Sequence, residues 1–282
     1  MSRILSISSQ VVRGYVGNSA VRFVLERLGH EVWALPTVML SNHPGHPKSA
    51  GLRMPVDTLT AMLGALDDNG WLGDVDAVLT GYLPSEAHAA FAEDTIVRLW
   101  KQNPDLLVLV DPVLGDDPRG LYVDAAAAAA VRDKLVPIAT IVTPNRFELA
   151  WLSGQEVTSG ATAAEAARSL APHYVLATSV PGERPEELVN TLIEGDSVWS
   201  VRVPQREQVP QGTGDLLAAL QLGHMLGSPK LGPLAAEQAL GVAIAGVQAV
   251  IEAGLDKRSD ELDLITTQDQ WVSPTALQID SA

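Results

Sequence analysis

Apolar and polar positions along the chain alternate between two patterns, short β-rich runs and longer stretches with apolar residues at helical spacing. Residues 106–110 are five apolar residues in a row, as in a parallel strand that helices cover on both faces. Residues 125–135 are rich in alanine, the strongest helix former. The patterns predict strands at 4–8, 31–35, 77–80, 106–110, 138–142 and 174–177, and helices at 18–28, 56–66, 85–101, 125–135 and from Arg146.

After the strand predicted at 174–177, the sequence pattern is typical of a β-hairpin. Two β-rich runs, 188–193 and 198–203, flank the turn sequence Glu-Gly-Asp-Ser. Helices are predicted at 213–226 and 234–253, whereas the tail after residue 257 is polar and ambiguous. This order predicts a single α/β domain over residues 1–282, with a doubly wound, mostly parallel central sheet, an antiparallel edge, and helices on both faces.

Several polar residues follow the predicted strands directly. Ligands of doubly wound sheets bind beyond the carboxyl ends of the parallel strands. We therefore expect a site that includes Ser9, Tyr82, Asp111, Thr143 and Asn145.

The stretch Gln-Gly-Thr-Gly-Asp at 211–215 runs straight into the apolar helix predicted at 213–226. Glycines let backbone N–H groups approach an anion closely, and a helix N-terminus adds unpaired donors and partial positive charge. A carboxylate beside such donors suits phosphoryl transfer, with Asp215 as the base. A glycine turn with an aspartate that stabilises a helix start explains the same five residues.

Composition narrows the class of protein. The 282 residues are 46% hydrophobic, enough for a large core, and carry a net charge of −15 that disfavours nucleic acid and anionic membranes as partners. Cysteine is absent, which excludes disulfides and thiol chemistry. The six histidines show no metal-site spacing, and we see no signal-peptide pattern and no long uninterrupted apolar run, so we expect a cytoplasmic soluble protein.

The motif at 212–215 resembles the signature of the ribokinase superfamily, and the other motifs are similar to those of pyridoxal kinases. In family order these are Ser6–Ala20, Ser41-Asn42-His43, Thr80-Gly81-Tyr82, Asp111–Asp116, Thr143–Glu148 and Gly212–Asp215. Together they cover nearly the whole chain. The resemblance implies a ribokinase-like fold, and the short segment between residues 35 and 56 leaves little room for the β-lid of many sugar kinases.

The resemblance assigns a role to each residue of the phosphoryl-transfer site. Asp215 is implied as catalytic base, with the N–H groups of Gly212, Thr213 and Gly214 holding the transferred phosphoryl group. Asp111 is implied as Mg²⁺ ligand, with Glu148 in the same cation network; an aspartate that binds its own loop and a first-turn glutamate are the ordinary readings. The implied ATP-binding residues are Asp111, Asp116, Tyr122, Thr143, Asn145, Glu148, Thr178, Ser179, Gly212 and Thr213, of which Thr143 is also a candidate ligand for a monovalent cation such as K⁺.

On the acceptor side, Ser9 and Tyr82 are implied to line a pyridoxal pocket together with Asp215, and we interpret His43 as a histidine that orders its own loop. The chain departs from the family pattern here. Gln10 stands where the family has His, and Pro44, His46 and Ser49 replace residues that approach the pyridine ring. We expect a raised KM for the acceptor with intact ATP chemistry.

The resemblance implies an ATP-dependent kinase that phosphorylates the 5′-hydroxymethyl group of pyridoxal, and of pyridoxine and pyridoxamine as further acceptors. A related hydroxymethylpyrimidine or sugar kinase, and a non-catalytic pyridoxal-binding protein on the same fold, are the alternatives. Family members tend to pair, so we expect a homodimer whose interface comes from residues 20–60.

Overall fold

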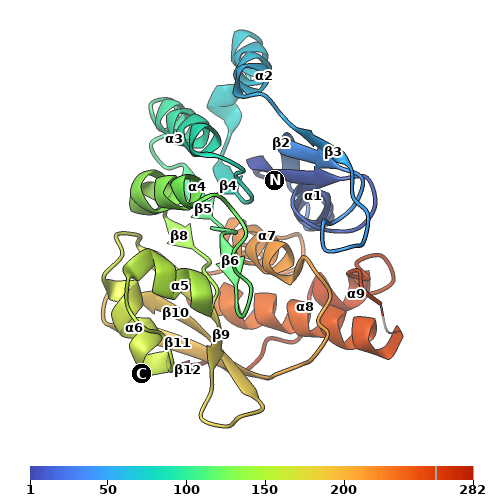
Figure 1. The fold of residues 1–282 in the computed structure, drawn as a ribbon, viewed down its shortest axis with the longest axis vertical. Coiled ribbons are helices and arrows are strands. Elements are labelled where there is room, and N and C mark those ends of the chain that lie inside the picture. Colours follow the sequence, from blue (N-terminus) through green and yellow to red (C-terminus); the bar gives the residue numbers. More distant parts are fainter. Residues whose placement is uncertain (258, 282) are drawn as a thin grey trace.

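A computed structural model describes residues 1–257 and 259–281 of the chain. Its core is a ten-stranded sheet with the order β12-β11-β10-β9-β8-β5-β4-β1-β2-β3 (Figure 1). The strands are β1 Arg3–Val11, β2 Glu31–Leu40, β3 Gly51–Arg53, β4 Ala77–Thr80, β5 Leu107–Val110, β8 Ile141–Val142, β9 Tyr174–Pro181, β10 Glu187–Glu194, β11 Ser197–Pro204 and β12 Asp280–Ser281. A separate short hairpin pairs β6 (Gly115–Asp116) with β7 (Gly120–Leu121).

The central strands of the sheet are parallel and its two edges are antiparallel. Every pairing from β2 through β1, β4, β5 and β8 to β9 is parallel. The β9-β10-β11-β12 edge and the β2-β3 pair are antiparallel. The predicted doubly wound sheet with an antiparallel edge is therefore confirmed.

Helices cover both faces of the sheet and bury two separate apolar clusters. One face carries α1 (Asn18–Arg27), α7 (Thr213–Leu226) and α8 (Ala236–Lys257), with the short α9 (Gln268–Trp271) beside α8. The other carries α2 (Val56–Asp68), α3 (Glu86–Trp100), α4 (Ala125–Ala130), α5 (Arg146–Ser153) and α6 (Gly160–Arg168). The connections change face around β1 and β4, and ligands of such sheets bind at the carboxyl ends of the strands on either side of this change.

Several elements differ from the sequence-based expectation. Strand β2 runs on to Leu40 and pairs with the unpredicted β3, a short extension rather than a large lid. Helix α6 was not predicted, although Ser159 gives it a capping box with Thr162. The strand expected at 138–142 contains only two residues because Pro137 lies in a short 3₁₀ turn just before it.

Residues 259–281, in the polar tail, make more contacts with the core of the fold than their composition indicates. Leu262, Leu264 and Trp271 are buried in the cluster beneath α7 and α8. The Trp271 indole donates to the Leu264 carbonyl at 3.0 Å, and Asp280–Ser281 add the edge strand beside β11. The β11–β12 pairing and the burial against α7 and α8 join residues that are distant in sequence, so periodicity could not predict them.

Helix α8 is long and apolar enough to cross a membrane by length and composition alone. In this fold 61% of its most apolar window is buried. It packs against α7 and against β10 and β11, so its apolar surface faces protein. We interpret α8 as a core helix of a soluble fold.

Candidate active site

The predicted site residues meet at the carboxyl edge of the parallel strands. Asp111 follows β5 and Thr143 follows β8, as expected. Tyr82 comes two residues after β4, where Ser8 Oγ accepts its backbone N–H at 3.2 Å. Ser9 lies inside β1 rather than after it, because β1 continues to pair with β2 as far as Val11, with a shift of register between Ser8 and Gln10.

The loop before α7 has a backbone geometry suited to binding an anion. Gly212 has φ +93°, and a Cβ there would lie 2.2 Å from the Tyr15 carbonyl oxygen, so only glycine fits. Helix α7 starts at Thr213, which leaves its first N–H groups free of intrahelical partners. Backbone donors and the positive end of the helix dipole therefore point to the same place.

Asp215 lies in the first turn of α7 and is partly accessible. The backbone N–H of Gly17, on the loop between β1 and α1, donates to its carboxylate. Burial raises the pKa of Asp215 to about 6, against the opposing effect of that hydrogen bond. At neutral pH it is an ionised carboxylate of raised basicity, which suits a general base.

Asp111 lies beside this loop, and its carboxylate is almost completely buried. The Thr143 hydroxyl donates to its Oδ1 at 2.9 Å, while a Cβ on Gly214 would lie 4.0 Å from its Oδ2. Burial, and then the charges of Glu148 and Asp215, raise the pKa of Asp111 well above its ordinary value. The charges of Glu148 and Asp215 therefore act on the buried Asp111 carboxylate, and a cation beside Asp111 would stabilise its ionised form.

Glu148 holds two segments of this site together. It forms a capping box with Asn145 at the start of α5 and accepts the N–H of Leu114 at 2.7 Å. Burial raises its pKa, although backbone N–H groups oppose the shift. Val113, next to Leu114, has φ +48°, a strained conformation for a β-branched residue. The loop after β5 is therefore fixed in a shape that Val113 would not adopt alone.

Asp116 and Tyr122 belong to the β6–β7 region above these carboxylates. Asp116 lies 3.7 Å from the Arg119 guanidinium, and its buried Oδ1 has no hydrogen-bond partner among the described residues. Asn145 Nδ2 donates to the Gly115 carbonyl at 2.8 Å and so ties this hairpin to α5. The pKa of the half-exposed Tyr122 is raised by burial first and then by the surrounding carboxylates.

Thr178 and Ser179 lie within β9, not after it as the sequence suggested. The pairing of β9 with β10 continues to Pro181, with an irregularity in register opposite Asn190. Ser179 has φ +57° there and is exposed. Thr178 forms an isolated bridge with Asn145, which brings it to the edge of the site.

On the acceptor side, Ser9 packs closely against the loop between β1 and α1. A Cβ on Gly17 would lie 2.2 Å from Ser9 Oγ. Burial raises the pKa of Tyr82, whose carbonyl accepts the Thr37 hydroxyl at 2.7 Å. His43 Nδ1 accepts the Gly45 N–H at 3.1 Å within its own loop, in agreement with the structural role expected for it.

The residues present fit a divalent cation bound together with phosphates. No group of three His, Cys, Asp or Glu side chains that could hold a metal occurs in residues 1–257 and 259–281. Mg²⁺ needs only one or two carboxylates when phosphates and water supply its other ligands. Asp111 and Glu148 provide hard oxygen donors, but the Glu148 oxygens already accept backbone N–H groups.

Sequence reasoning missed two residues that the fold places at the site. Gly17 contacts Asp215, and the two glycines at positions 14 and 17 are the only local sequence signal for this contact. Glu261 comes from the tail that was considered ambiguous, and it lies against Gly14. No pattern in the tail indicates this contact.

Comparisons with known proteins agree with this geometry. The family model described as phosphomethylpyrimidine kinase matches residues 53–260. Pyridoxal kinase PdxY of Rubrobacter xylanophilus is 38% identical over 96% of this chain and 94% of its own length. Pyridoxal kinase PdxY of Leifsonia xyli is 35% identical over 96% of each chain. A pyridoxal kinase of Leishmania donovani, solved with ADP and pyridoxamine, superposes with a TM-score of 0.92, 31% identity and full coverage of both chains.

The fold and the site therefore define a small-molecule kinase built on a doubly wound α/β sheet. More narrowly, the chain belongs to the pyridoxal kinase family. The family, the fold class without a large lid and the enzyme class predicted from the motifs are confirmed.

Proposed function

We propose that this enzyme transfers the γ-phosphoryl group of ATP to the 5′-hydroxymethyl group of pyridoxal, giving pyridoxal 5′-phosphate and ADP. One observation carries the proposal: Asp215, whose pKa is raised to about 6, lies in the first turn of α7 beside a glycine loop that exposes backbone N–H groups. Pyridoxine and pyridoxamine carry the same hydroxymethyl group and are expected as further acceptors.

In this mechanism Asp215 takes the proton of the acceptor hydroxyl as its oxygen attacks the γ-phosphorus. The new O–P bond forms while the bond between the γ-phosphorus and the β,γ-bridging oxygen breaks, and ADP leaves. The N–H groups of Gly212, Thr213 and Gly214 hold the transferred group. They are fixed before the reaction, so they stabilise the developing charge without reorganisation.

The buried carboxylates define the nucleotide side. Asp111 and Glu148 would hold Mg²⁺ together with the phosphates, with Thr143 and Asn145 orienting them. Bound Mg²⁺ would neutralise charge on the triphosphate. Asp116, Tyr122, Thr178 and Ser179 complete the proposed nucleotide contacts, and a monovalent cation such as K⁺ would bind at Thr143.

The acceptor ring would lie between Ser9 and Tyr82, within reach of Asp215. The structure turns His46 toward the tail, where its Nε2 is 3.3 Å from Glu261 Oε1. With Pro44 and Ser49 on the same loop, residues 44–49 offer no Phe, Tyr or Trp side chain to the ring. We therefore expect a raised KM for pyridoxal, because this loss of binding is uniform between ground and transition state.

The test is turnover with ATP and a panel of acceptors: pyridoxal, pyridoxine, pyridoxamine, hydroxymethylpyrimidine and ribose. Pyridoxal should be phosphorylated, and Asp215→Asn should lower kcat about 10²–10⁴-fold with ATP binding retained. Asp196→Asn, on the exposed hairpin turn, is the matched control. Faster turnover of hydroxymethylpyrimidine would favour the second candidate function, which the matching family model supports. An unchanged kcat in Asp215→Asn would show that Asp215 is not the catalytic base.

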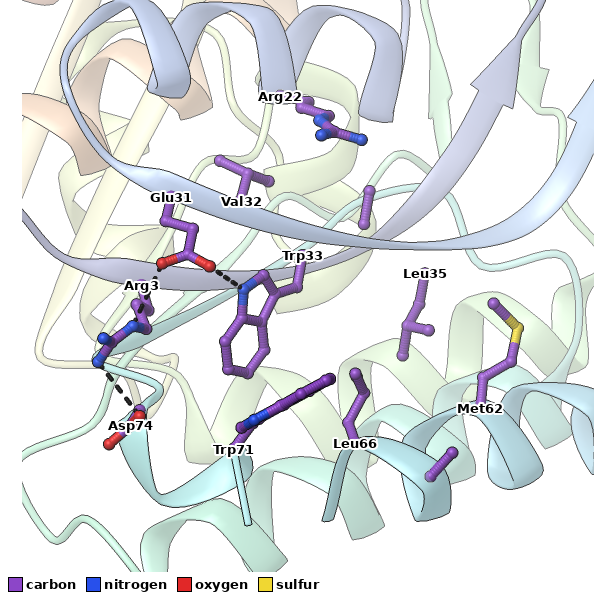
Figure 2. Close-up of a pocket in the computed structure, with 12 residues that line it drawn as sticks. Arg3, Arg22, Glu31, Val32, Trp33, Leu35, Met62, Leu66, Trp71 and Asp74 are labelled. Carbon is purple, nitrogen blue, oxygen red and sulfur yellow. Dashed lines mark hydrogen bonds and ion pairs between the residues drawn. The ribbon is translucent and has the colours of Figure 1, made fainter. Parts of the chain in front are cut away.

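We also propose that the enzyme is a cytoplasmic homodimer. A groove of about 770 Å³ lies between β2, α1 and α2, with Trp33, Leu35, Met62, Leu66 and the half-exposed Trp71 along it (Figure 2). Arg3 bridges Glu31 and Asp74 at its rim. Apolar walls with both signs of charge at the rim are self-complementary, as a two-fold interface requires.

Light scattering tests this assembly. The wild-type protein should have a dimer mass at micromolar concentration, and Trp71→Lys should shift it to monomer. Ile265→Lys changes an exposed apolar residue on the tail and should leave the mass unchanged. A monomeric wild-type protein would refute the proposed dimer.

A further inference from the structure

Glu261 connects three loops that surround the candidate acceptor site. Its Oε1 accepts a hydrogen bond from Arg13 Nη1 at 2.8 Å and lies 3.3 Å from His46 Nε2. A Cβ on Gly14 would lie 2.2 Å from its Oε2. Its backbone forms a parallel bridge with Gln211, the residue before the anion loop.

Each of these loops bears on the proposed chemistry. The loop at 12–17 carries Gly17, whose N–H donates to Asp215. The loop at 41–50 carries Pro44, His46 and Ser49, which the family resemblance places near the acceptor ring. The loop at 210–214 supplies the anion site. Glu261 is the point in the described part of the chain where contacts to all three converge.

The surroundings of Glu261 make its carboxylate an effective clamp. Its side chain is only 15% exposed, whereas that of Arg13 is 64% exposed. Leu262 is buried beside it, and its Cδ1 would lie 3.2 Å from a Cβ on Gly212. Ser259 Oγ donates to the Glu261 carbonyl at 2.8 Å and accepts its N–H at 3.1 Å, so the backbone is fixed as well.

We propose that Glu261 is a positioning residue for the acceptor. It holds the 12–17 and 41–50 loops against the anion loop, and so preorganises the acceptor pocket before substrate binds. An exposed ion pair alone contributes little, but one anchored carboxylate that restrains two loops removes freedom that the acceptor would otherwise have to order. This inference rests on the proposed function for its kinetic part only.

The kinetic test compares Glu261→Ala and Glu261→Gln with Asp256→Asn, which removes an exposed charge at the end of α8. For Glu261→Ala we expect about a tenfold rise in KM for pyridoxal, with KM for ATP and kcat changed less than about twofold. Glu261→Gln keeps the shape and one acceptor oxygen and should recover part of the loss. Equal rises in both KM values, or an unchanged pyridoxal KM, would overturn the proposal.

Hydrogen–deuterium exchange tests the same inference without turnover. Glu261→Ala should speed exchange in residues 12–17 and 41–50 at least about fivefold, and leave the strands β4 and β5 unchanged. Arg13→Ala should speed exchange in the 12–17 loop alone. If a wild-type protein fails to phosphorylate any acceptor, the proposed function fails. Unchanged loop exchange in Glu261→Ala would reject the clamp by itself.

Discussion

His224 gives the sharpest physical prediction for this protein. It lies on α7 with 0% exposure, and neither ring nitrogen has a hydrogen-bond partner in the described structure. Burial, and then the neighbouring His30, lower its pKa from the ordinary 6.5 to about 4. An imidazole that must stay neutral in the fold, yet protonates freely when unfolded, makes stability depend on pH.

The sign and size of this effect follow from the two pKa values. Between pH 6.5 and about 4 the unfolded state binds more protons at this position, so stability falls as the pH falls. Linkage gives a loss of about 2–3 kcal/mol between about pH 7.5 and about pH 4.5. Replacement by leucine removes this loss. At neutral pH His224→Leu should be about 1 kcal/mol more stable, because an unpaired buried polar group costs about 1–3 kcal/mol, partly offset by repacking.

The assay is urea unfolding followed by circular dichroism across this pH range, for wild type, His224→Leu and His173→Leu. His173 has a 61% exposed side chain paired with Glu194, so its replacement controls for loss of a surface histidine. Carboxylates titrate alike in wild type and His224→Leu, so the difference between these two stability curves isolates the contribution of His224. Parallel curves for wild type and His224→Leu would refute the reasoning.

Three further predictions concern the candidate site. The pH profile of kcat/KM should show an acid limb near pH 6, about a tenfold loss per pH unit below it, because Asp215 must be deprotonated; a flat profile down to about pH 5 would contradict this. In a Mg²⁺ titration, Asp111→Ala should raise the Mg²⁺ concentration needed for half-maximal rate more than it alters KM for pyridoxal. Full activity of the wild-type enzyme in excess chelator would contradict this role of Asp111. Gly212→Ala should lower kcat about hundredfold, because the new Cβ would clash with the Tyr15 carbonyl oxygen. The control Gly154→Ala, at a glycine with φ +68° but no atom within 4 Å of the new Cβ, should retain activity. Equal activity of the two variants in steady-state assays would exclude the steric argument.

Local patterns were enough to predict most of the scaffold. The apolar run at 106–110 and the strand at 77–80 are central strands, as their composition indicated. Helix α7 starts at Thr213 and ends at Leu226, the bounds that its apolar pattern predicted. These elements agree with their sequences because both faces of a central strand, and most faces of a core helix, bury apolar side chains.

The candidate site was predictable as far as it lies next to those elements. Asp111, Thr143 and Asp215 adjoin a strand end or a helix start, so alternation alone places them at one edge of the sheet. Strand β9 continues past Thr178 because it pairs there with β10. The conformation of Val113, with φ +48°, likewise depends on contacts with other segments. Such backbone shapes are imposed by the surrounding fold rather than by local preference.

The sequence by itself determined the alternation of strands and helices, the family motifs and the identity of the carboxylates at the strand ends. Only the tertiary structure decided that Gly17 donates to Asp215, that His46 turns toward the tail, and that Glu261 joins three loops. The physical reason is the separation in sequence of the residues that make each contact. Periodicity records which side chains a local element must bury, whereas Arg13 and Glu261 are 248 residues apart and meet only after the sheet has formed.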